Sequence, residues 1–258
     1  MCIRDRYEVI LSGRTRSHDE RHAVNTLLAY RCEAVLMLGP DLEETEINRV
    51  AASVPVVLAG RRMVHPVATV DSIRTDEDEA LGVAIDHLVA LGHRTIAHVD
   101  GGSGTISGDR RRAYRAHMKR RGLGDHLHVV AGDGTAACGE RAAQELLALE
   151  HRPTAVVAFN DEVALALMHA LTHRGSTIPD DMSVVGYDGS SLSRLAPRVL
   201  TTIRQDADAI GRQAVERAIA RLEESATTPI DQVLPPTLVE GETTGRPRAT
   251  GTGSVSRR

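Results

Sequence analysis

The chain has 258 residues, of which 41% are hydrophobic and 26% are charged, and its formal net charge at pH 7 is −4. This is an ordinary soluble globular composition, with enough residues for one large or two modest domains and no overall basic field to hold nucleic acid. No apolar run approaches the length of a membrane span, and the three cysteines form neither a disulfide framework nor a metal-ligand pair. We therefore expect a reduced, cytoplasmic protein with no metal, no cofactor and no membrane partner.

The first six residues, MCIRDR, show no apolar period and lack the features of a signal or transit peptide. Back-translated, they resemble the mosaic end of a transposase sequencing adapter. We therefore interpret residues 1–6 as an assembly scar, with native sequence beginning near Tyr7. The alternative is a genuine short N-terminus.

Apolar runs and helical patterns alternate along the rest of the chain. The predicted strands are 7–12, 34–39, 54–60, 95–101, 126–132, 155–160 and 183–188. The predicted helices are 19–31, 42–52, 76–91, 109–121, 136–149, 161–174 and 206–224. Most strand runs are continuous rather than alternating, as in parallel strands covered on both faces. The pattern predicts an α/β fold with doubly wound parallel sheets.

Late extended segments, LTTI and VLPPTLV, follow the last predicted strand and the last predicted helix. They predict a chain that leaves one lobe, crosses and returns. The tail, residues 246–258, has no period and is rich in Gly, Ser, Thr and Arg, so we expect it to be disordered.

A glycine-rich loop, DGGSGTISGDRRR, precedes a predicted helix. Such a loop can hold a phosphate, but its spacing matches neither nucleotide-binding motif, so we favour a simple strand-to-helix turn. Arg110, Arg111 and Arg112 crowd the start of that helix, where the helix dipole disfavours cations. We expect one of them to have a compensating partner, such as a hydroxyl or carboxylate of a ligand.

Polar residues follow two further predicted strands, at the sheet edge where open α/β folds bind ligands. We interpret Asn160 as a ligand contact and Asp161 mainly as a helix cap. Asp188 can accept hydrogen bonds from vicinal hydroxyls, although on local sequence it can equally initiate a turn before Gly189. His98 lies in mid-strand and is expected to be a satisfied core residue. No catalytic motif is present, so we do not expect an enzyme.

Four segments, taken in order, resemble the effector-binding core of LacI/GalR-type bacterial transcriptional regulators. They are AIDHLVALGHRTIAHVDG (84–101), RPTAVVAFNDEVALALMHAL (152–171), IPDDMSVVGYDGSSLSRLAPRVLTTIRQD (178–206) and LPPTLVEGETTG (234–245). The resemblance covers nearly all of 7–245. It implies a two-lobed periplasmic-binding-protein-like fold, and a homodimer in which a small effector, commonly a sugar or nucleobase, sits between the lobes and changes operator affinity.

The resemblance also implies a division of the chain. Residues 7–91 and 206–233 would form the N-terminal lobe, and residues 94–202 and 237–245 the C-terminal lobe. The three crossovers are expected near Gly92–His93, near Ile203, Arg204 and Gln205, and near Pro235.

Matched by position, four residues carry the family's effector-binding roles: Arg110, Asn160, Asp188 and, more loosely, Asp76. Gly134 stands where the family often has an aromatic residue, and GRR at 60–62 replaces a usual Asp-Arg pair. Aromatic residues make up only 2% of the chain, so no sugar-stacking platform is evident and the effector class stays open.

Family members begin with a helix-turn-helix, a hinge helix and a first strand–helix unit, none of which precedes Tyr7. We therefore expect that this chain cannot recognise an operator and that a sheet edge is left unpaired. The alternative reading is a solute-binding protein of a sugar transporter. A nucleotide-binding enzyme is a third reading, disfavoured by the missing phosphate motif.

Overall fold

The structure, a computed structural model, describes residues 7–15, 19–65, 67–195, 198–224 and 228–248. They form two compact units. Unit 1 holds the described residues up to Asp76 together with Asp206–Leu234, and unit 2 holds Glu77–Gln205 together with the described residues from Pro235 onward. The proposed scar and the part of the predicted tail after residue 248 lie outside the described residues. The start of that tail is placed, since Arg248 forms ion pairs with Asp180 and Asp181.

Unit 1 is a parallel sheet with the strand order β1-β2-β3-β9. Its strands are β1 (Val35–Leu38), β2 (Val56–Ala59), β3 (Val70–Thr75) and β9 (Asp231–Leu234), and its helices are α1 (Glu20–Ala29), α2 (Glu44–Ala51) and α8 (Ala207–Leu222). Alternate residues of β2 point to opposite faces. Val56 and Leu58 join the core made with α1 and α2, whereas Val57 and Ala59 join the core made with α8.

Unit 2 is a sheet with the order β10-β8-β7-β6-β4-β5, parallel except where β10 pairs with β8. Its strands are β4 (Ile96–Val99), β5 (His128–Val130), β6 (Ala155–Ala158), β7 (Ser183–Asp188), β8 (Thr201–Arg204) and β10 (Thr237–Val239). Its helices are α3 (Glu77–Ala90), α4 (Thr105–Arg120), η1 (Gly124–His126), α5 (Ala136–Ala148), α6 (Asp161–His173) and α7 (Leu192–Leu195).

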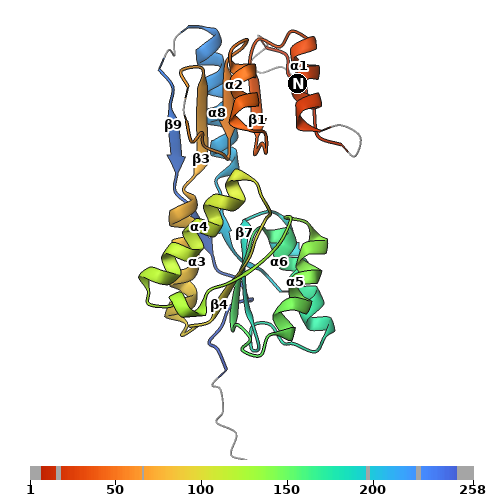
Figure 1. Ribbon diagram of the computed structural model, residues 1–258, viewed down its shortest axis with the longest axis vertical. Coiled ribbons are helices and arrows are strands. Elements are labelled where there is room, and N and C mark those ends of the chain that lie inside the picture. The colour runs from red at the N-terminus through yellow and green to blue at the C-terminus, as the bar shows by residue number, and fades with distance from the viewer. Residues whose placement is uncertain (1–6, 16–18, 66, 196–197, 225–227, 249–258) are drawn as a thin grey trace, which may run out of the picture. The chain divides into compact units, whose positions relative to one another are not determined.

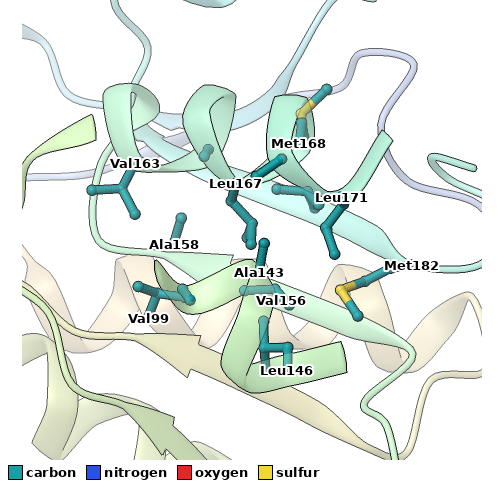
Figure 2. Close-up of a cluster of buried hydrophobic side chains, with 14 of the residues drawn as sticks. Val99, Ala143, Leu146, Val156, Ala158, Val163, Leu167, Met168, Leu171 and Met182 are labelled. Carbon is teal, nitrogen blue, oxygen red and sulfur yellow. The ribbon is translucent and has the colours of Figure 1, made fainter. Parts of the chain in front are cut away.

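Helices cover both faces of the unit 2 sheet, α3 and α4 on one side and α5 and α6 on the other (Figure 1). Figure 2 shows the second of these cores, where side chains of α5 and α6 meet those of β4 and β6. Gly139 lets α5 and α6 approach closely, because a Cβ there would lie 2.5 Å from the Val163 carbonyl oxygen. Together with unit 1, this arrangement confirms the predicted two-lobed fold with doubly wound parallel sheets.

The first predicted crossover is wrong. The chain passes from unit 1 to unit 2 between Asp76 and Glu77, so α3 belongs to unit 2 and not to the N-terminal lobe. Leu81, Ile85 and Leu88 of α3 are buried in the same core as residues of α4. His93 is buried within unit 2, where its ring nitrogens hydrogen-bond the Thr154 hydroxyl (2.8 Å) and the Gly245 carbonyl (2.8 Å).

Gly92, with φ 105°, therefore makes the turn that ends α3 rather than a hinge. The other two passages lie between Gln205 and Asp206 and between Leu234 and Pro235. Ile203 and Arg204 end β8 just before the second passage, and Pro235 is the first residue after the third.

Two strand predictions also differ from the structure. Residues 8–12 form no strand, and Val9, Ile10 and Leu11 are exposed. Conversely, β3 was not predicted, because it buries polar side chains where an apolar run was sought. Asp71 is fully buried in β3 and is held by Arg217 and Arg221 of α8.

Candidate functional site

Polar side chains gather at the carboxyl edge of the unit 2 sheet. Asp100 follows β4, Phe159 and Asn160 follow β6, and Asp188 ends β7. These strands lie side by side in the order β7-β6-β4. The carboxyl ends of adjacent parallel strands meet at one edge of a sheet, so residues far apart in sequence share this edge.

Arg110 is a buried charge at this edge, with 4% of its surface exposed. Its Nε and Nη2 donate to the two carboxylate oxygens of Glu77 at 2.8 and 3.3 Å, and Nη1 donates to the Phe159 carbonyl at 2.5 Å. The guanidinium also lies over the Tyr187 ring, 3.4 Å from its centroid. Burial acts to lower the pKa of Arg110, but the charge and hydrogen bonds of Glu77 together with Tyr187 and Asp188 outweigh it, so the pKa is raised and Arg110 stays charged.

Glu77 is a site residue that we did not predict from the sequence. It accepts hydrogen bonds from Arg110 and, at 2.7 Å, from the Tyr187 hydroxyl. The predicted acid was its neighbour Asp76, which belongs to unit 1, where its backbone N–H donates to the Leu234 carbonyl at 3.1 Å. The usable signal was the run of acids at 76–79, in which Glu77 stands four positions before buried Leu81 on the inward face of the helix.

The helix predicted from residue 109 begins at Thr105, so Arg110, Arg111 and Arg112 lie inside α4 and not at its start. All three pair with carboxylates of the protein. Besides the Arg110 pair with Glu77, Arg111 binds Asp100 and Arg112 binds Asp109. Asp100 is itself buried and accepts a hydrogen bond from the Gly101 N–H at 2.9 Å. Each arginine thus has the kind of compensating partner that we expected for one of them, and that partner is a carboxylate of the protein.

The helix cap that we predicted at Asp161 is wrong, because Asn160 caps the helix instead. The Asn160 side chain caps α6, since Oδ1 accepts from the Val163 N–H at 2.8 Å, and Nδ2 donates to the Gly134 carbonyl at 3.0 Å. Asp161 is 1% exposed and points instead to the loop after β7, where it accepts hydrogen bonds from Ser190. Asn precedes the helix and Asp is already inside it, so only Asn has the backbone geometry of a cap.

Asp188 has an unusual backbone and an unusual carboxyl group. Its φ is 102°, a region that residues other than glycine rarely adopt. Its Oδ1 accepts a hydrogen bond from Gln205 Nε2 at 2.8 Å. Burial raises the pKa of Asp188 to about 6, against the opposing effects of the Arg110 charge and the Gln205 hydrogen bond.

Phe159 is an aromatic residue at this edge, as is Tyr187, and it was not singled out from the sequence. Its ring packs over two glycines: a Cβ on Gly101 would lie 2.4 Å from the ring, and a Cβ on Gly134 would lie 3.2 Å from it. Arg110 lies over the ring at 4.7 Å from the centroid. Gly134, noted above as a departure from the family pattern, thus leaves space that Phe159 uses.

Only one ring nitrogen of His98 has a hydrogen-bond partner among the described residues. It is fully buried in β4, and its Nδ1 interacts with the Val157 carbonyl at 3.0 Å, but its Nε2 has no hydrogen-bond partner among the described residues. Burial lowers the pKa of His98 to about 4, so the ring is neutral at pH 7 and stacks with Tyr114 at a centroid distance of 5.4 Å.

Over the described ranges, no cluster of His, Cys, Asp and Glu has the geometry to hold a metal ion. Within the same ranges, no helix is long and apolar enough to cross a membrane. Two linked α/β units, each with helices on both faces of a mainly parallel sheet and with polar groups at the carboxyl strand ends of unit 2, define a protein of the periplasmic-binding-protein class. Residues 85–244 match the family described as "Periplasmic binding protein-like domain".

Individual proteins and solved structures that are similar to this chain indicate a family within this class. The lactose operon repressor of Escherichia coli K12 is 30% identical over 93% of this chain and 66% of its own length. A LacI transcriptional regulator from a Rhodococcus species superposes with a TM-score of 0.87 at 40% identity, covering 94% of this chain and 89% of that one. The lac repressor dimer bound to operator and an anti-inducer has a TM-score of 0.78 at 30% identity, covering 87% and 78%.

The chain belongs to the LacI/GalR family of transcriptional regulators. It spans about two thirds of the length of the curated relatives that it matches. The relatives are regulators, which confirms the prediction that the chain is not an enzyme.

Proposed function

We propose that this chain is the effector-sensing core of a LacI/GalR-type repressor, active as a cytoplasmic homodimer. A small hydroxyl-rich ligand, such as a sugar, binds at the carboxyl edge of the unit 2 sheet and changes the affinity of the complete protein for operator DNA. The names of its relatives support this proposal, since one is a lac repressor dimer bound to both operator and an anti-inducer.

The chemistry of the edge favours a ligand with hydroxyl groups. Among the described residues, Gln205 is the hydrogen-bond donor to the Asp188 carboxylate, and it uses only Oδ1. Oδ2 is therefore available to accept from a ligand hydroxyl. The partly exposed Phe159 ring, which follows the neighbouring strand β6, offers an apolar surface at the same edge, and such rings pack well on the C–H faces of sugars.

The observation that carries the proposal is that two residues of the site's polar network lie next to the passages between the units. Glu77, which binds Arg110, directly follows the first passage between units, and Gln205, which binds Asp188, directly precedes the second. A ligand that competes for Arg110 or Asp188 thus acts on residues joined covalently to those passages. Coupling between a ligand and a distant site requires such differential contacts.

A thermal-shift screen of monosaccharides, disaccharides and nucleosides tests ligand binding. We expect one class to raise the melting temperature of the chain, and Asp188→Asn to lose that shift. Asn tolerates a positive φ better than Ala, so this variant changes charge more than backbone geometry. Asp125→Asn, an exposed acid in η1, is the matched control and should keep the shift. Equal shifts in all three proteins would remove Asp188 from the site.

Operator coupling needs a separate experiment. A version of the protein extended by the upstream genomic sequence is titrated with its operator in a mobility-shift assay, with and without the ligand from the screen. We expect the ligand to change operator affinity in the extended protein. An operator affinity that the ligand leaves unchanged would contradict the proposal.

A further inference from the structure

Asp161 holds the loop after β7 although it belongs to α6. Its Oδ2 accepts from the Ser190 N–H at 2.7 Å and from the Ser190 hydroxyl at 2.8 Å, and its Oδ1 accepts from the Thr202 hydroxyl at 2.6 Å. The Thr202 oxygen in turn accepts from the Gly189 N–H at 3.3 Å. One buried carboxylate therefore fixes, directly or through Thr202, both residues that follow Asp188.

Gly186 of β7 leaves room for the Asp161 carboxylate. A Cβ on Gly186 would lie 2.4 Å from Asp161 Oδ1, closer than real Cβ contacts come. Gly186 is in the middle of β7, where a glycine otherwise weakens a strand. Its presence is explained by the close approach of the Asp161 carboxylate.

The turn at the end of β7 has an unfavourable backbone conformation, which other groups must stabilise. Asp188 has φ 102° and Gly189 has φ 65°, so two successive residues lie in the left-handed region. Glycine adopts this region freely, but aspartate does so at a cost and persists there only where surrounding groups determine it. The Gln205 N–H donates to the Asp188 carbonyl at 3.3 Å, which is a long hydrogen bond. The hydrogen bonds that Asp161 accepts from Ser190 and Thr202 are shorter, at 2.6 to 2.8 Å, and add a second constraint on the turn.

We propose that Asp161 is a positioning residue, which acts through Ser190 and Thr202 to hold Asp188 in its left-handed conformation at the sheet edge. The functional value of this positioning rests on the ligand site proposed above, because Asp188 is its central carboxylate. The positioning itself is a property of the unliganded protein and is tested without a ligand.

Thr202→Val is the sharpest variant, because it removes the bridging hydroxyl without changing size or charge. Asp161→Asn is less clean, since the Asp161 charge itself acts on the Asp188 carboxyl. Thr201→Val is the matched control. Thr201 is equally buried in the adjacent position of β8, but its hydroxyl contacts Thr244 and the Gly241 N–H instead of the turn.

The measurement is carbon-13 NMR of Asp188 in the whole chain, using its Cα and Cβ shifts for the backbone and its carboxyl shift for titration. In the wild type and in Thr201→Val we expect left-handed backbone shifts and a carboxyl pKa of about 6. In Thr202→Val we expect the backbone shifts to move toward extended values. As the carboxyl leaves its buried position, its pKa should fall toward the ordinary 3.8. Arg110, Glu77 and Asp161, the charged groups that act on it, are unchanged in all three proteins.

Unchanged Asp188 shifts and titration in folded Thr202→Val would overturn the proposal. If that variant does not fold, Ser190→Ala, which removes one of the two Ser190 hydrogen bonds, provides the same readouts with a smaller expected displacement. No displacement in Ser190→Ala would also count against it. Failure of the ligand screen would leave these NMR results standing, so the two proposals fail independently.

Discussion

Replacing Glu77 by Gln should destabilise unit 2 strongly. The substitution removes the carboxylate that binds Arg110 through 2.8 and 3.3 Å hydrogen bonds, while Arg110 remains 4% exposed. Breaking a buried ion pair by removing one partner costs about 3–5 kcal/mol, because the other charge is left without compensation. Gln keeps one oxygen that can accept from Arg110 or Tyr187, so we expect the lower end, about 3 kcal/mol. That corresponds to a fall in melting temperature of roughly 6–12 °C at this size.

The assay is urea unfolding followed by circular dichroism, with amide exchange of β7 and α4 to separate unit 2 from unit 1. Glu79→Gln, an exposed acid on the same helix, is the control and should stay within about 0.5 kcal/mol of wild type. Arg110→Met completes a double-mutant cycle, in which the double variant should lose less stability than the two single losses added. A Glu77→Gln loss under about 1 kcal/mol, or strictly additive losses, would refute the reasoning.

Three further predictions concern charge. Because the folded pKa of Asp188, about 6, exceeds its ordinary 3.8, its contribution to stability is present below 3.8 and is lost as pH rises to about 6. Asp188→Asn should remove this decline, which is at most about 3 kcal/mol before solvent screening. The folded pKa of His98, about 4, lies below its ordinary 6.5, so its contribution to the free energy of unfolding is present above pH 6.5 and is lost as the pH falls. His98→Leu should therefore reduce the pH dependence of the free energy of unfolding, measured with urea from pH 7 to 4.5. Asp71→Asn removes the buried negative charge that Arg217 and Arg221 share and should cost unit 1 about 3–5 kcal/mol, seen as faster amide exchange in β3 and β9.

Much of the fold could be predicted from local patterns of apolar and charged residues in the sequence. Continuous apolar runs such as AVVAFN located β6, and the acids that begin DEVALALMHALTHR together with its final His and Arg located α6. The strands that failed mark the limit of this reasoning. Residues 8–12 have strand composition but form no strand, and β3 was missed because Asp71 and Ser72 are buried polar residues whose partners lie far along the chain.

The site was predictable by position but not by role. Arg110, Asn160 and Asp188 do lie along the carboxyl strand edge of unit 2, as strand ends and the family resemblance indicated. Which atoms they bind was not available locally. Asn160 and Asp161 are adjacent, and only the observed helix start decides that Asn160 is the cap and Asp161 the anchor of the β7 loop.

By itself, the sequence determined the α/β class, the family and the strand ends where polar residues gather, because apolar periodicity and motif strings are local properties. Tertiary structure alone decided that Glu77 binds Arg110, 33 residues away, and Tyr187, 110 residues away. It also decided that α3 packs with unit 2. The packing of α3 depends on which apolar faces are buried against each other. The pairing of Glu77 depends on which partners that packing brings within hydrogen-bond distance, because a buried charge must be paired.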